Sequence, residues 1–134
     1  MTHAVGDTLP SFVITATPES MKIWAVILHD PNPIHLDPEV VRAKGLGDRV
    51  INQGPTNVAY IMNALHAAFP GGAIEMCDVR FLDNVYGGEV VEASGKITDI
   101  GEADGVRRTE CDVWLKATGR DLVLSGRAIV AERL

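Results

Sequence analysis

The sequence is poor in cysteine, in basic residues relative to acidic ones, and in long apolar runs. Its two cysteines, Cys77 and Cys111, lie far apart and form no C-x-x-C pair, so neither a zinc site nor a disulfide framework is predicted, and we expect both to be buried free thiols. The chain has 12 lysines and arginines against 18 acidic residues, and the net charge of −6 argues against a nucleic-acid partner. No apolar run approaches the roughly 20 residues that span a membrane, so no membrane contact is expected.

The chain also lacks the features of a multidomain or exported protein. At 134 residues it is long enough for one hydrophobic core and too short for two. It contains no linker, low-complexity segment or internal repeat. The first residues include Asp7 and have neither the basic start nor the apolar stretch of a signal peptide, so we expect a cytoplasmic location.

Helical patterns occupy the first half of the chain. Thr17-Pro18-Glu19-Ser20 offers a capping hydroxyl and a proline in the first turn, and the helix that follows is expected to stop at Asp30, the residue before Pro31. A short helix is expected over residues 38–44. Gln53-Gly54-Pro55-Thr56 starts another helix, whose broad apolar stripe predicts a central position against a sheet. The stripe consists of Val58, Ile61, Met62, Leu65 and Ala68.

Strand patterns follow the central helix. The expected strands cover residues 73–82, 89–100, 106–117 and 122–131, with an early strand near residues 9–16. In the third of the late strands, apolar and polar residues alternate with the period of two that is typical of a sheet solvated on one face. The turns between these strands, including Tyr86-Gly87-Gly88, are short, so we expect an antiparallel meander. The predicted fold is α+β, with a curved antiparallel sheet wrapped around the helix that begins at Gly54.

The most informative stretch is His29-Asp30-Pro31-Asn32-Pro33-Ile34-His35-Leu36-Asp37. Each proline fixes its own φ and biases the preceding residue toward an extended conformation, so this loop is stiff. A stiff loop that carries a carboxylate and an imidazole holds both toward one point with little further loss of entropy. Asp30 and His35 are therefore candidates for acid–base catalysis.

Three segments of the chain point to a known family. They are Asp30 to His35, the Gln53-Gly54 step, and Val79-Arg80-Phe81-Leu82 leading to Tyr86-Gly87-Gly88-Glu89. In this order and approximate spacing they resemble the MaoC-like (R)-specific enoyl-CoA hydratase and dehydratase family of the hot-dog fold. The resemblance covers nearly the whole chain and implies one hot-dog domain over residues 1–134. One departure is His29, because the family usually has a small residue, commonly glycine, before the acid.

The resemblance implies the reversible syn addition of water to a trans-2-enoyl-CoA, which gives an (R)-3-hydroxyacyl-CoA. Asp30 and His35 would share one water, and which of the two activates it stays open. The candidate for stabilising the enolate oxygen is the backbone N–H of Gly54, because the first N–H groups of a helix have no internal partner and lie at the positive end of its dipole. Pro55 has no N–H, which leaves Thr56 as a less direct donor. A purely structural alternative makes Gly54 the N-cap residue and Pro55 the first helical residue.

Four residues are predicted to contact the substrate: Asn32, Pro55, Thr56 and Tyr60. For Asn32 an Asx turn that orders the loop is the favoured role. No separate cofactor is expected, because coenzyme A is part of the substrate. No metal is expected either, since two prolines stiffen the span that holds His29, Asp30, His35 and Asp37.

Two other functions stay open. A hot-dog acyl-CoA thioesterase commonly carries its acid on the central helix, and no acid lies between Gly54 and Phe69. A supporting subunit of a heteromeric hydratase is the other alternative, although such a subunit does not need Asp30 and His35. The expected curved sheet leaves edge strands exposed, so we expect a homodimer, or a hetero-oligomer with another hot-dog subunit.

Overall fold

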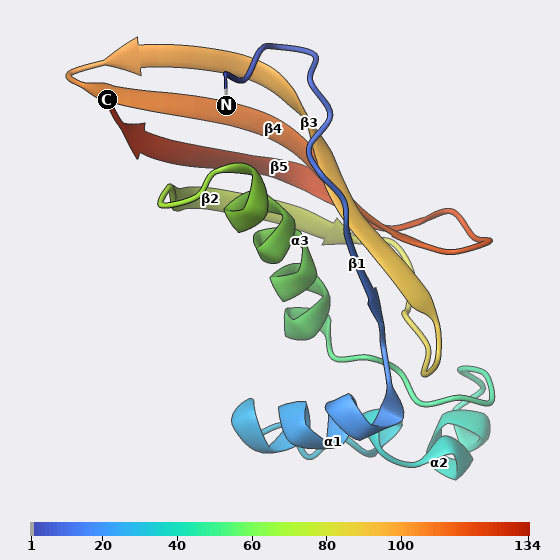
Figure 1. Ribbon diagram of the computed structural model, residues 1–134. Coiled ribbons are helices and arrows are strands. Elements are labelled where there is room, and N and C mark those ends of the chain that lie inside the picture. Colours follow the sequence, from blue (N-terminus) through green and yellow to red (C-terminus); the bar gives the residue numbers. More distant parts are fainter. Residues whose placement is uncertain (1) are drawn as a thin grey trace.

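The computed structural model describes residues 2–134 and contains one five-stranded antiparallel sheet. The strands are β1 (Phe12–Thr15), β2 (Ala73–Phe81), β3 (Val90–Ala103), β4 (Val106–Ala117) and β5 (Leu122–Arg133). Their order in the sheet is β1-β3-β4-β5-β2. The sheet curves along its length, and one helix, α3 (Gly54–Ala68), lies against its concave face (Figure 1). The predicted α+β class and the predicted central helix are confirmed.

The expected meander is only partly right. β3, β4 and β5 are consecutive neighbours, but β2 pairs with β5, where Cys77 opposes Ala128. Residues 82–89 are therefore no hairpin turn but a crossover from one edge of the sheet toward the other. This crossover is held by backbone bonds to the segment before α3: the Asn52 N–H donates to the Val85 carbonyl at 2.7 Å, and the Gly87 N–H donates to the Val50 carbonyl at 2.8 Å. Alternation along a strand fixes its inner face but not its neighbour, which is why the pattern missed this pairing.

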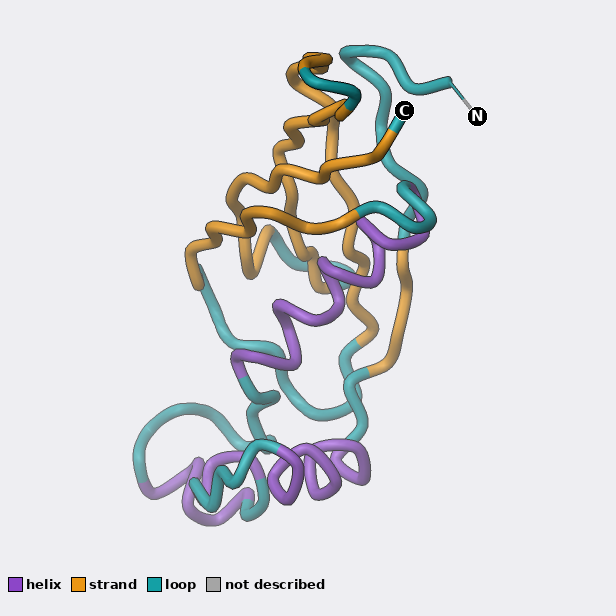
Figure 2. The backbone as a smooth tube through the Cα atoms, turned by 90° about the vertical axis from the view of Figure 1, so that its left-hand side faces the viewer, coloured by secondary structure: helices purple, strands orange, loops and turns teal. Residues whose placement is uncertain are grey.

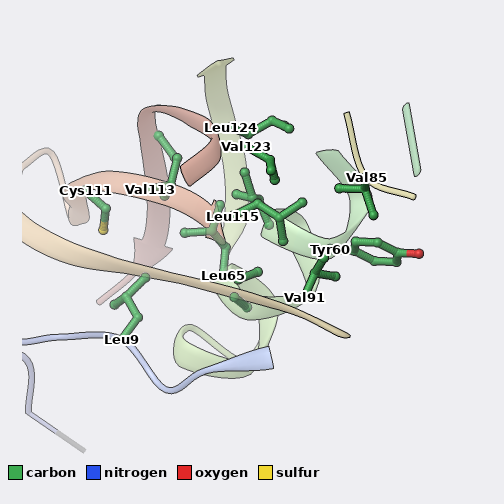
Figure 3. Packing of buried hydrophobic residues seen from close by; sticks show 14 of the residues in the cluster. Leu9, Tyr60, Leu65, Val85, Val91, Cys111, Val113, Leu115, Val123 and Leu124 are labelled. Atoms are coloured by element: carbon green, nitrogen blue, oxygen red, sulfur yellow. The ribbon is translucent and has the colours of Figure 1, made fainter. Parts of the chain in front are cut away.

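The core lies between α3 and the concave face of the sheet (Figure 3). Ile61 and Leu65 of the predicted stripe are at most 1% exposed, whereas Met62 is 36% exposed, so the buried face of α3 is narrower than predicted. In β4 the alternation holds, and its inward residues are fully or almost fully buried. They are Thr109, Cys111, Val113, Leu115 and Ala117. Cys77, by contrast, is only half-buried.

A second group of short elements lies beyond one end of the sheet (Figures 1 and 2). It consists of α1 (Pro18–Ile27), the 3-10 turn η1 (Pro33–His35) and α2 (Pro38–Ala43). The Thr17 side chain caps α1 by accepting a hydrogen bond from the Ser20 N–H at 3.1 Å, as expected. α1 ends at Ile27, earlier than the proline rule indicated, because His29 adopts a left-handed φ of 50° that a helix cannot contain. Among residues 2–134, no helix has the length and apolar character needed to cross a bilayer.

Candidate active site

The loop after α1 is ordered by two successive side-chain turns. Asp30 Oδ1 accepts a hydrogen bond from the Asn32 N–H at 3.1 Å, and Asn32 Oδ1 accepts one from the Ile34 N–H at 3.3 Å. Asn32 is thus the N-cap of η1, which is the Asx-turn role favoured from the sequence. Its side chain is exposed and its oxygen is committed to the backbone. Asp37 caps α2 in the same manner, through the Glu39 N–H.

Asp30 and His35 meet across this loop. His35 Nε2 lies 3.2 Å from Asp30 Oδ2, and the His35 side chain is 9% exposed. The other ring nitrogen, Nδ1, lies 2.6 Å from the Ile51 carbonyl oxygen. A carbonyl only accepts hydrogen bonds, so Nδ1 carries a proton, and Nε2 is the ring nitrogen that faces the Asp30 carboxyl group. The loop therefore brings a carboxyl group and an imidazole nitrogen together at one point.

The first turn of α3 leaves one backbone donor free. Gln53 is the N-cap residue, so Gly54 is the first helical residue and Pro55 the second, which corrects the assignment of Gly54 as the cap. The Thr56 N–H donates to the Gln53 carbonyl at 3.1 Å, and so does the Asn57 N–H at 3.2 Å. Thr56 is therefore no amide donor to a substrate. Within residues 2–134 the Gly54 N–H donates to no protein acceptor, and it lies at the positive end of the helix dipole.

His35 and Gly54 face the same cavity, which has a volume of about 440 Å³. One of its walls comes from the crossover, through Leu82, Asp83 and Asn84. The cavity is also lined by Ile34, Ile51, Asn52, Asn57 and Phe81. The structure thus places His35 of the predicted acid–base pair and the predicted backbone donor on one cavity, and Asp30 lies beside it through its contact with His35.

An apolar groove adjoins this polar cavity. The groove has a volume of about 660 Å³ and is lined by Gly54, Pro55, Val58, Met62 and Phe81. Gly54 and Phe81 border both spaces. A Cβ on Gly54 would lie 3.2 Å from the edge of the Phe81 ring, so the glycine allows this ring to close over the helix start. The site therefore has a polar end at His35 and an apolar end along α3.

A buried polar cluster lies behind the cavity. The Asn52 side-chain amide donates to Asn57 Oδ1 at 2.7 Å and to the Tyr60 hydroxyl at 3.2 Å. Burial raises the pKa of the Tyr60 phenol, and the Asn52 hydrogen bond opposes that rise. Tyr60 and Thr56, both predicted to contact substrate, are 5% and 0% exposed and line neither the cavity nor the groove.

Sequence reasoning missed Asn52 and Asn57, which are each 3% exposed and line the cavity. A signal was present for Asn57, because it precedes the buried Ile61 by four residues and so occupies the inner face of the helix. A polar residue on an otherwise apolar helix face is either hydrogen-bonded inside the protein or placed for a ligand.

Arg120, in the turn between β4 and β5, holds the crossover that forms the cavity wall. Its guanidinium donates to both carboxylate oxygens of Glu89, at 2.9 and 2.8 Å, to Asp83 Oδ2 at 2.9 Å and to the Asn84 carbonyl at 2.6 Å. Its charged end also lies 5.5 Å from the centre of the Tyr86 ring. The hydrogen bond to Glu89 raises the pKa of Arg120 further above its already high value. The two cavity residues Asp83 and Asn84 are thereby fixed from outside the site.

No group of three or more His, Cys, Asp or Glu side chains in residues 2–134 is arranged to hold a metal ion. His29 is exposed, and its left-handed backbone closes the turn between α1 and the loop that carries Asp30 and His35.

Solved structures of other proteins share this fold. The (R)-hydratase from A. caviae involved in PHA biosynthesis superposes with a TM-score of 0.86 at 21% identity, covering 96% of each chain. A chain of the ChsH1-ChsH2 complex from Mycobacterium tuberculosis superposes with a TM-score of 0.81 at 19% identity, covering 99% of this chain and 100% of that one. These likenesses establish the hot-dog fold.

Sequence comparison identifies the family of the chain. The mitochondrial 3-hydroxyacyl-[acyl-carrier-protein] dehydratase of Arabidopsis thaliana is 31% identical over 87 residues, which are 65% of this chain and 51% of that protein. The chain thus spans about half the length of this curated relative. The family model of the MaoC like domain matches residues 4–117, which include Asp30, His35 and Gly54. The chain belongs to the MaoC-like hydratase and dehydratase family, as its sequence motifs had indicated.

Proposed function

We propose that this protein is an (R)-specific enoyl-CoA hydratase that adds water reversibly to a trans-2-enoyl-CoA. The observation that carries the proposal is the shared cavity: His35, which lies 3.2 Å from Asp30, and Gly54, whose N–H is free, line it from different elements. The two side chains transfer protons, and the backbone N–H stabilises the negative charge that develops on the thioester oxygen. Hydration of a conjugated thioester needs both.

The reaction follows from this arrangement. As the water oxygen bonds to C3, the acid–base pair takes a proton from it, and the π electrons move toward the thioester oxygen, which the Gly54 N–H stabilises. The same pair then returns a proton to C2 as the carbonyl reforms, so that one water is added and the pair is unchanged. Because Asp30 and His35 lie together, both additions are made from one side of the substrate, which is syn addition. The apolar groove along α3 takes the acyl chain.

Two alternatives have less support. A thioesterase that uses an acid on the central helix is disfavoured, because α3 carries no Asp or Glu. A supporting subunit is the stronger alternative, since a matched chain comes from a complex of two different proteins. It is disfavoured because such a subunit would not need an intact Asp30–His35 pair. No separate cofactor is required for the proposed step.

We further propose that residues 1–134 act as one hot-dog domain within a homodimer. In residues 2–134 the outer edges of β1 and β2 pair with no other strand, and Phe81 and Leu82, at the end of β2, are 57% and 54% exposed. A second hot-dog subunit of another kind is the alternative partner. Light scattering during size-exclusion chromatography measures the assembly directly.

A panel of trans-2-enoyl-CoA thioesters, short, long and bulky, tests the function. Hydration is followed by loss of the conjugated thioester absorbance, and the product is resolved by chiral chromatography. We expect an (R)-3-hydroxyacyl-CoA. Thioesters of acyl carrier protein, offered in parallel, identify the carrier that the protein prefers. An (S) product, or no turnover by the purified chain until another subunit is added, contradicts the proposal.

A further inference from the structure

The amide of Asn57 is unusually placed for a helix residue. Asn57 is 3% exposed, lies on the inner face of α3 and lines the same cavity as His35 and Gly54. Its Oδ1 accepts a hydrogen bond from Asn52 Nδ2 at 2.7 Å, which fixes the orientation of the amide. Within residues 2–134 its Nδ2 donates to no protein acceptor. A fixed amide group with a free donor therefore borders the cavity.

Asn52 holds this amide in place. The Asn52 backbone N–H donates to the Val85 carbonyl at 2.7 Å, and its side chain bridges Asn57 and the Tyr60 hydroxyl. Asn52 Oδ1 is buried without a hydrogen-bond partner. Incompletely satisfied polar groups are rare in protein interiors, and the ones that occur call for a functional explanation. Asn52, Asn57 and Tyr60 therefore form a buried polar cluster in which one side-chain oxygen has no partner.

Asn57 follows Gly54 by three residues, so both lie on one face of α3. We propose that Asn57 Nδ2 is a second donor to the thioester oxygen of the substrate, beside the Gly54 N–H. This inference rests on the proposed hydratase function and adds a catalytic residue to it. A second donor adds a second hydrogen bond to the enolate oxygen. Because both donors are held in place by the protein, neither must reorient as the charge develops.

The Asn57→Asp variant separates this role from a structural one. Aspartate keeps the oxygen that accepts from Asn52 and removes the N–H donors. We expect kcat to fall about 100-fold, the magnitude typical of losing one oxyanion donor, with KM changed by less than about threefold. Asn63→Asp is the matched control, because Asn63 lies on the exposed face of the same helix and its replacement leaves kcat unchanged.

A second measurement does not depend on the variant folding well. In the ¹⁵N-labelled wild-type protein, the side-chain NH₂ signals of Asn57 are expected to shift on saturation with butanoyl-CoA, a thioester that cannot be hydrated, while those of Asn63 stay in place. Wild-type hydration with an undiminished Asn57→Asp variant, or with unmoved Asn57 signals, overturns this inference and leaves the proposed function standing. A wild-type protein that neither hydrates nor binds any thioester overturns both.

Discussion

The sheet with α3 and the group of loops at its end are stabilised in different ways. The sheet and α3, which together we call the sheet half, bury a continuous set of apolar side chains. Among them are Leu65, Leu115 and Leu124, each at most 1% exposed. The loop end, which we define as residues 17–53 and 82–89, is ordered mainly by prolines, Asx turns and single hydrogen bonds. Apolar burial in the sheet half is distributed over many contacts. In the loop end, by contrast, a single proline, Asx turn or hydrogen bond fixes the position of one functional group. Substitutions in the two regions should therefore change different properties: stability in the sheet half, and activity in the loop end.

The largest effect is expected at the acid–base pair. Asp30→Asn and His35→Gln each remove one partner of the 3.2 Å contact, and hydration is expected to slow by about 10²- to 10⁴-fold. Because the surrounding restraints are retained, the melting temperature should change little. Enoyl-CoA turnover and thermal unfolding, measured on the same samples, check both statements.

Asp37→Asn is the control for this pair, since Asp37 lies in the same loop but only caps α2. Asparagine is an equally good cap, so activity and stability should both be retained. If Asp30→Asn and His35→Gln kept full activity on every thioester of the panel, the catalytic assignment would be wrong.

The core of the sheet half gives the opposite result. Leu65→Ala creates a cavity at a position 1% exposed, and the free energy of unfolding should fall by about 2 to 5 kcal/mol. Urea titration measures this loss. Val13→Ala on β1, at a position 58% exposed, should cost no more than about 0.5 kcal/mol. Equal losses for the two variants would contradict the placement of the core.

Arg120→Ala tests the connection between the two regions. The substitution leaves Glu89, whose side chain is 10% exposed, without its ionic partner, so the free energy of unfolding should fall by about 1 to 3 kcal/mol. Because Asp83 and Asn84 then lose their anchor, KM for the thioester should rise as well. Arg107→Ala, which breaks the exposed pair with Glu102, should change stability by less than about 1 kcal/mol and leave KM unchanged. Equal changes in stability and KM for the two variants would show that Arg120 does not anchor the cavity wall.

The smallest expected effect leaves the protein unchanged in sequence. Burial raises the pKa of the Cys111 thiol to about 11 from its usual 9.0. Below pH 9 the reactive thiolate is therefore scarcer by about 100-fold than in an ordinary thiol, and iodoacetamide should label Cys111 far more slowly than it labels the half-buried Cys77. Mass spectrometry of the labelled peptides measures the order. In urea both cysteines should react at similar rates, and rapid native labelling of Cys111 would indicate that the sheet opens.

Much of the fold could be predicted from the sequence, because it is encoded locally. The cap at Thr17, the start of the central helix at Gln53-Gly54 and the alternation in β4 each depend on a few adjacent residues. The partner of β2 could not be predicted, since its pairing with β5 depends on residues about 50 positions apart and on the path of the crossover.

The site was predictable to the extent that it is contiguous in sequence. Asp30 and His35 are five residues apart in a loop stiffened by proline, and that stiffness was visible in advance. Arg120 reaches Glu89 and Asp83 across 31 and 37 residues, so no local pattern marks it. The left-handed backbone of His29 was also hidden, because no proline or glycine stands at that position.

In the proposed reaction, one acid–base pair on one side of the substrate delivers both the hydroxyl group and the proton. Hydration of trans-2-butenoyl-CoA in D₂O tests it directly, since NMR coupling between the C2 and C3 protons of the product reports the relative position of deuterium and hydroxyl. We expect deuterium and hydroxyl on the same face, with the (R) configuration at C3. Deuterium and hydroxyl on opposite faces, or a mixture of the two products, would contradict it.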